Sequence, residues 1–226
     1  MHFTQDFIDF FKELAANNNR EWFHANKKRY EISVKITFNS FVQLVLDELA
    51  KTDVRYAELS PKDCVFRINR DIRFSKDKSP YKLQMGAIIT RGGRKNMHGE
   101  PGMYLEFTPE HLRLYSGFYM PEKETLHRIR EYIIGQPEQL EEALNGRKFK
   151  DRFGEIRGDK NKRLPTKQMM AAASENPIIL NKQFYFFTEM PAETLLRDDL
   201  IELLFTAYSD SAEVREYLSK AAGVEH

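Results

Sequence analysis

The sequence has a single cysteine, Cys64, and therefore cannot form an internal disulfide. Without disulfides the fold must be held by a hydrophobic core, and a chain of 226 residues is long enough to bury a substantial one. Because a lone cysteine is typical of a reducing compartment, we expect a cytoplasmic protein.

Long uninterrupted apolar stretches are also lacking. A helix that crosses a bilayer needs ~20 predominantly apolar residues, and the apolar runs of this sequence are much shorter. Residues 1–14 have no cationic start followed by an unbroken apolar segment, so they do not resemble a secretory signal. We therefore expect no membrane partner and no secretion.

The chain has almost no net charge, with 35 Lys and Arg against 34 Asp and Glu. A general nucleic-acid-binding domain is usually strongly basic, so this balance argues against one. The charge is nevertheless uneven, because residues 67–98 contain nine Lys or Arg and only two Asp. The sequence therefore predicts one electropositive segment on a mildly acidic body.

The spacing of apolar residues predicts helices in the N-terminal and C-terminal parts of the chain. The predicted helices cover residues 4–16, 18–50, 121–134, 137–144, 192–208 and 211–222. The β-branched stretch 32–40 is expected to kink or break the second of them. Residues 145–168 are polar and are predicted to be irregular.

Between these helices, alternation of apolar and polar residues predicts strands. The predicted strands cover residues 66–74, 83–91, 103–107, 112–119 and 183–187. In the first strand the apolar face is interrupted by Arg70. The pattern predicts a single α+β domain over residues 1–226, an antiparallel sheet of about five strands with the N-terminal and C-terminal helices packed on one face.

The polar face of this predicted sheet is the candidate site. Alternation places on one face Arg67, Asn69, Asp71, Arg73, Tyr104, Glu106, Arg113, Tyr115 and Tyr119. Arginine forks and tyrosine hydroxyls suit a planar or anionic ligand, and the loop after the first strand adds lysines and hydroxyls at the rim. The predicted ligand-binding residues are Arg67, Asn69, Arg73, Ser75, Lys76, Lys78, Tyr81, Lys82, Tyr104 and Tyr115. Asp71 is the one nearby candidate for a catalytic base.

A structural interpretation of the same residues stays open. Arg and Asp that alternate on a strand often form ion pairs across an exposed sheet face, and lysines in a loop are usually only solvated. The six histidines show no spacing typical of a metal site, so none is predicted. The sequence indicates no particular cofactor.

Two stretches resemble a known family. "NNNREWFHANKKRYE" (17–31) and "FRINRDIRFSKDKSPYK" (66–82) are similar to the signature of the bacterial and fungal family called domain of unknown function 2461. The resemblance covers roughly residues 7–217 and implies an α+β fold and a soluble protein, without an established activity or catalytic residues. Between 154 and 187 the sequence departs from the family pattern, with "RLPTKQMMAAASENP" where a Pro-Lys-Gly-Tyr-like run is expected.

Three functions are compatible with these observations. The first is a binder of, or an enzyme acting on, a small anionic ligand that carries phosphate or carboxylate and contacts residues 67–82. The alternative is a nucleic-acid or nucleotide-binding module that uses the same basic segment. The third is a protein-interaction scaffold in which the polar face is a structural network of ion pairs. The sequence does not indicate the oligomeric state.

Overall fold

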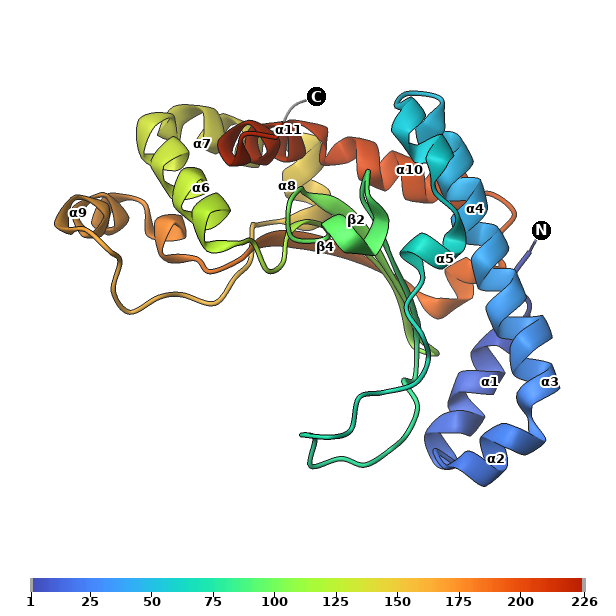
Figure 1. Ribbon diagram of the computed structural model, residues 1–226. Coiled ribbons are helices and arrows are strands. Elements are labelled where there is room, and N and C mark those ends of the chain that lie inside the picture. The colour runs from blue at the N-terminus through green and yellow to red at the C-terminus, as the bar shows by residue number, and fades with distance from the viewer. Residues whose placement is uncertain (1, 225–226) are drawn as a thin grey trace. The chain divides into compact units, whose positions relative to one another are not determined.

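The computed structural model describes residues 2–224 and contains helices and one four-stranded antiparallel sheet (Figure 1). The chain divides into two compact units. Unit 1 contains Met1–Arg94, Tyr104–Arg113 and Glu189–Leu204, and unit 2 contains Lys95–Met103, Leu114–Thr188 and Phe205–His226. The two units are described separately below.

The strands of the sheet follow one another in sequence order. They are β1 (Met85–Ile89), β2 (Gly102–Phe107), β3 (His111–Phe118) and β4 (Phe184–Pro191). Buried and partly exposed residues alternate along β3, with Leu112, Leu114 and Phe118 in the core. This alternation is the one that predicted the strands at 83–91, 103–107, 112–119 and 183–187, and all four are confirmed.

The predicted strand at 66–74 is wrong. This segment makes one isolated bridge, between Asn69 and Tyr81, and no strand. Phe74, which alternation assigned to the core, is 95% exposed. Because Arg70 interrupts the apolar side of the pattern, the segment has no continuous face to bury against the helices. The sheet therefore has four strands and not about five.

The first part of unit 1 is helical. Its elements are α1 (Gln5–Ala16), α2 (Arg20–Ala25), α3 (Lys27–Arg29), the π-helix η1 (Tyr30–Ile36), α4 (Thr37–Ala50), the 3-10 helix η2 (Val54–Glu58) and α5 (Pro61–Cys64). Asn19 caps α2 by accepting a hydrogen bond of 2.9 Å from the backbone N–H of Trp22. The Trp22 ring lies 5.5 Å from that of the buried Phe10. The break expected within 32–40 is present in part, as the π-helix that ends at Ile36.

Unit 2 is also largely helical. Its elements are α6 (Lys123–Gly135), α7 (Pro137–Asn145), α8 (Arg147–Phe153), α9 (Lys167–Glu175), the 3-10 helix η4 (Pro177–Leu180) and α11 (Ala212–Ala222). The 3-10 helix η3 (Gly93–Asn96) and α10 (Leu200–Asp210) contain residues of both units, and the 3-10 helix η5 (Ala192–Leu196) belongs to unit 1. The prediction that 145–168 is irregular is wrong for α8, because Phe149 and Phe153, four residues apart, are buried on one helical face. No helix in the described residues has the length and apolar character needed to span a membrane.

Gly117 in β3 provides a test of the packing of unit 2. Its φ is +98°, and an added Cβ would overlap the backbone oxygen of Phe184. We expect Gly117→Ala to lower the free energy of unfolding by about 2 kcal/mol or more, because both strain and a backbone shift are imposed. Urea denaturation measures this change.

The matched control is Gly135→Ala at the end of α6. Apart from Gly135's own helix and chain neighbours, no atom of the described residues lies within 4 Å of a Cβ added there, and its φ is not positive. The control should change the free energy of unfolding by no more than about 1 kcal/mol. Equal effects of the two substitutions would contradict the close approach of β3 and β4 at Gly117.

Candidate functional site

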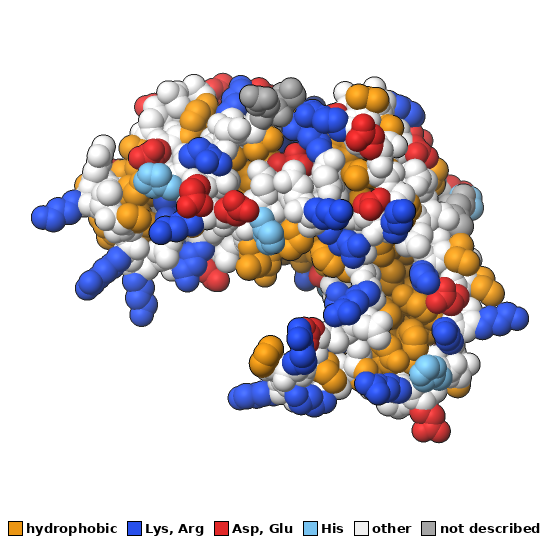
Figure 2. All heavy atoms as spheres, viewed as in Figure 1, with side chains coloured by type: hydrophobic (Ala, Val, Ile, Leu, Met, Phe, Trp, Pro, Cys, Tyr) orange, Lys and Arg blue, Asp and Glu red, His pale blue; other side chains and the backbone are white. Residues whose placement is uncertain are grey.

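Residues 67–82 form an extended loop that folds back on itself, named here the basic arm (teal in Figure 1). Backbone hydrogen bonds join its two sides near its base: the Arg70 N–H donates to the Pro80 oxygen at 2.9 Å, and the Lys82 N–H donates to the Ile68 oxygen at 2.8 Å. Lys and Arg side chains crowd around the end of the arm (Figure 2). The basic arm is therefore a paired structure at its base and largely exposed beyond it.

Asn18 and Phe23 anchor the basic arm. The Asn18 side-chain amide donates to the Tyr81 oxygen at 3.0 Å and accepts from the Tyr81 N–H at 3.1 Å, so it acts as a neighbouring strand would. The buried Tyr81 ring stacks on Phe23 with 3.9 Å between the ring centroids. Residues of the stretch 17–31 thus hold the basic arm in position.

Two arginines of the arm are neutralised within it. Arg73 donates to the Asp71 carboxylate at 2.6 Å, and Arg70 pairs with Asp77. The hydrogen bonds from Arg73 hold the pKa of Asp71 below its usual range. Because a general base works best with a pKa near the ambient pH, Asp71 is poorly suited to that role.

Two other cations lie over the ring of Phe66, and a third, Arg67, acts on one of them. The Lys82 Nζ lies 5.3 Å from the ring centroid, and the guanidinium carbon of Arg94 lies 5.8 Å from it. Burial, followed by the positive charges of Arg67 and Arg94, lowers the pKa of Lys82. We name Phe66, Arg67, Lys82 and Arg94 the basic corner.

The charges of the basic corner are not balanced by carboxylates. Among the residues that the structure describes, none of the three cations has an ion-pair partner. Arg94 donates to the backbone oxygens of Lys62 at 2.7 Å and Asp63 at 3.3 Å, which orient its guanidinium without neutralising it. Like charges held this close together repel one another, so an anion placed among them would be stabilised.

Tyr104 and Gln84 lie next to the basic corner. The Phe66 and Tyr104 rings meet edge to face with 6.1 Å between centroids. Gln84 Nε2 lies 3.4 Å from the Tyr104 hydroxyl and donates to Glu106 at 2.8 Å. An added Cβ at Gly86 would lie 2.8 Å from the Tyr104 hydroxyl oxygen, so the absence of a side chain there makes room for the ring.

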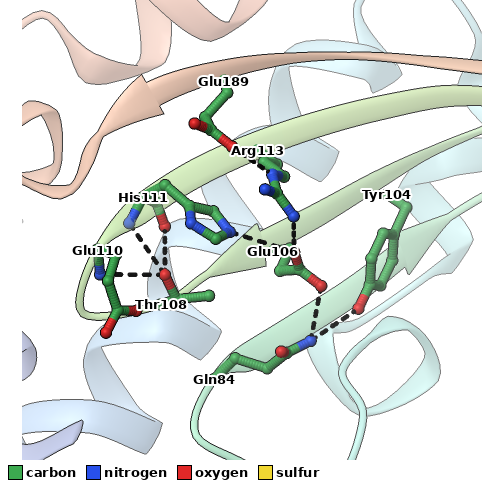
Figure 3. Close-up of polar contacts among 8 residues, drawn as sticks. All are labelled: Gln84, Tyr104, Glu106, Thr108, Glu110, His111, Arg113 and Glu189. Atoms are coloured by element: carbon green, nitrogen blue, oxygen red, sulfur yellow. Dashed lines mark hydrogen bonds and ion pairs between the residues drawn. The ribbon is translucent and has the colours of Figure 1, made fainter. Parts of the chain in front are cut away.

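Glu106 is also part of a ladder of charges across β2, β3 and β4 (Figure 3). Its carboxylate lies 3.4 Å from both Arg113 Nη1 and His111 Nε2. Arg113 Nε donates to Glu189 at 2.6 Å and holds the pKa of that carboxyl below its usual range. The prediction from alternation that Tyr104, Glu106 and Arg113 share one face is confirmed, and the charged members of this set form structural ion pairs.

The structure brings together part of the predicted ligand-binding set. Lys82 and Tyr104 lie against the Phe66 ring, and the charge of Arg67, the next residue along the chain, acts on Lys82. Sequence analysis missed Arg94 as a member of the site, although it belongs to the basic segment, because a turn through two glycines brings it back to Phe66. It also missed Phe66, which the predicted strand placed in the core.

The other predicted residues lie elsewhere. On the arm itself are Asn69, Arg73, Ser75, Lys76 and Lys78. There Lys76 is exposed, and Lys78 donates to a backbone oxygen of the arm at 2.9 Å. Tyr81 is in the core, and Tyr115 belongs to unit 2, where its ring lies 4.9 Å from that of Phe187. The predicted ten residues thus do not share one surface of unit 1.

The remaining titratable groups limit the chemistry of the molecule. Cys64 is buried, and burial raises the pKa of its thiol to about 11, so it is protonated and a poor nucleophile at neutral pH. Within residues 2–224, no group of three or more His, Cys, Asp or Glu side chains could hold a metal ion.

Comparison with known families gives one match. Residues 6–217 match the model of the family described as conserved hypothetical protein (DUF2461). The chain belongs to the DUF2461 family. Both motif stretches, 17–31 and 66–82, lie in the matched range, and in the structure they contact each other through Asn18, Phe23 and Tyr81. None of the curated proteins compared with the chain is similar enough to match.

The anchor of the basic arm can be tested with Asn18→Ala. The substitution removes both hydrogen bonds to Tyr81, an expected loss of about 1–3 kcal/mol in the stability of the arm. We expect trypsin to cleave the native variant several-fold faster within residues 67–82, as mass spectrometry of the first fragments would show.

Asn17→Ala is the control. The Asn17 side chain donates only to the Glu13 backbone oxygen at the end of α1, so its loss should leave cleavage of the arm unchanged. If both variants are cleaved at the same rate within the arm, or if cleavage in the Asn18 variant begins outside it, the proposed anchor is wrong.

Proposed function

We propose that the basic corner binds a small anionic ligand that carries a phosphate or carboxylate group. One observation carries this proposal: Lys82 and Arg94 lie over the Phe66 ring, the charge of Arg67 acts on Lys82, and no carboxylate among the described residues pairs with any of the three cations. Proteins normally separate or neutralise such charges, because their repulsion lowers the stability of the folded state. Clusters of this kind are typical of sites where a ligand supplies the compensating charge.

The neighbours of the corner support binding of an oxyanion. Arg67 is exposed and offers a planar fork, whereas the half-buried Lys82 offers a point charge. The orientation of Arg94 is fixed by its two backbone acceptors, so it would lose little side-chain entropy on binding. The ring of Phe66 forms the floor between Lys82 and Arg94.

The same neighbours favour a small ligand. Gln84 connects the Tyr104 hydroxyl to the Glu106 carboxylate, so negative charge borders the site on the sheet side. An extended polyanion that reached past Tyr104 would meet this carboxylate and be repelled. A single phosphate or carboxylate group held at the corner would avoid that repulsion.

Thermal unfolding tests the proposal with pyrophosphate and succinate as probes, at ionic strength matched with NaCl. A ligand at ten times its dissociation constant adds about 1.4 kcal/mol, which should raise the midpoint by about 3–5 °C. We expect Lys82→Gln to abolish this increase. Its midpoint without ligand should equal or exceed that of the wild type, because one repulsive charge has been removed.

Lys76→Gln is the matched control, since it removes the same charge from an exposed lysine of the arm. It should retain the full stabilisation by the anion. Stabilisation lost equally in both variants would assign the effect to the overall charge of the arm, and the absence of stabilisation of the wild type by either probe would refute the proposal.

The lowered pKa of Lys82 predicts the pH dependence of binding. A bound anion favours the charged amine, so the pKa of Lys82 is higher in the complex than in the free protein. The affinity for the anion should therefore be full below the pKa that Lys82 has in the free protein, and it should fall as pH rises through that pKa. Because the pKa of Lys82 is lowered, this fall should occur at lower pH than for a lysine with the ordinary pKa of 10.5. Isothermal titration calorimetry between about pH 7 and 10 measures this fall, which Lys82→Gln should remove.

A further inference from the structure

Unit 2 carries aromatic side chains on the partly exposed face of β3 and β4. The Tyr115 ring lies 4.9 Å from Phe187 and 6.3 Å from Tyr185, and Tyr119 lies 5.5 Å from Tyr185. We name Tyr115, Tyr119, Tyr185 and Phe187 the aromatic face. Tyr115 lies on β3, Tyr119 directly follows the end of β3, and Tyr185 and Phe187 lie on the adjacent β4. Neighbouring ring centroids are within stacking or edge contact distance.

The aromatic face is not part of the core of unit 2. The alternation of β4 directs Phe184 and Phe186 into that core, and Tyr185 and Phe187 to the opposite side. Tyr119 is 64% exposed. A row of aromatic rings that remains partly exposed is unusual on a surface without a binding partner.

A basic segment borders the aromatic face. Residues 157–167 contain five Lys or Arg and one Asp. The segment pairs antiparallel with the start of β4, where the Arg157 N–H donates to the Tyr185 oxygen at 2.6 Å. The Arg157 guanidinium carbon lies 4.2 Å from the centre of the Phe187 ring, so the cation stacks on the aromatic face itself.

The charges of this segment are exposed and available. Figure 2 shows Lys and Arg side chains that project around the loop leading into α9. All five cations are exposed, and none has a carboxylate partner among the residues that the structure describes. The five are Arg157, Lys160, Lys162, Arg163 and Lys167.

We propose that the aromatic face and the segment 157–167 bind single-stranded nucleic acid. Every base presents a flat ring that can stack on Tyr or Phe, and cations beside such a surface contact the phosphates. The segment supplies the positive charge that an uncharged sugar or an apolar peptide would not need. A duplex hides its base faces, so it could use the cations and not the rings. This proposal is independent of the anion site in unit 1.

Fluorescence anisotropy with a labelled 12-residue oligo(U) or oligo(dT), at low salt and with the full chain, tests the proposal. We expect Tyr119→Ala to weaken binding about fivefold to a hundredfold, because a stacking ring is lost. The double variant Arg157→Gln with Lys160→Gln should weaken binding and reduce the dependence of log affinity on log salt by about 1–2.

Phe74→Ala is the control for an exposed aromatic residue beside cations, because Phe74 is 95% exposed on the basic arm of unit 1. It should bind the oligonucleotide as the wild type does. The proposal is overturned if Phe74→Ala weakens binding and Tyr119→Ala does not, which would place the nucleic acid on the arm. It is also overturned if the oligonucleotide does not bind at low salt, or if a duplex of equal length binds as tightly.

Discussion

A single side-chain amide holds the backbone of Tyr81 through both its N–H and its carbonyl oxygen, and the basic part of unit 1 depends on this contact. Tyr81 precedes Lys82, whose position over Phe66 follows from the fixed backbone. Asn18 lies between α1 and α2, so its two hydrogen bonds, together with the stacking of Phe23 on Tyr81, connect the helices of unit 1 to its basic residues. Both stretches, 17–31 and 66–82, lie within the range that the family model matches.

Two groups of cations in unit 1 differ in their partners: one group pairs with carboxylates, and the other belongs to the basic corner. On the arm, Asp71 and Asp77 neutralise neighbouring arginines, and the Glu106 ladder does the same on the sheet. At the basic corner, three cations remain without such partners in the described part of the chain. A protein retains an unfavourable local arrangement of this kind when function outweighs the gain in stability from removing it. This contrast between paired and unpaired cations is the basis of the proposed anion site.

The sequence predicted the fold better than the site, for physical reasons. Strands such as β3 bury one regular face, so local alternation predicts them, and the sharing of one face by Tyr104 and Arg113 follows. The strand predicted at 66–74 fails because Arg70 interrupts its apolar face, and the segment forms only an isolated bridge from Asn69 to Tyr81, which local alternation does not reveal. Arg94 reaches the site through a turn, which local periodicity also cannot show. For α8 a signal was present, in the spacing of Phe149 and Phe153, but six charged residues within 147–155 obscured it.

The position of Trp22 has a practical consequence. It is the only tryptophan in the chain and belongs to unit 1. Its backbone N–H donates to the side chain of Asn19, the residue that follows Asn18. Indole emission therefore reports on the environment of one unit alone, whereas far-ultraviolet circular dichroism records the helices of both. Transitions that coincide by the two methods would show that the chain melts cooperatively as a whole, and transitions that separate would resolve the melting of each half without any engineered label.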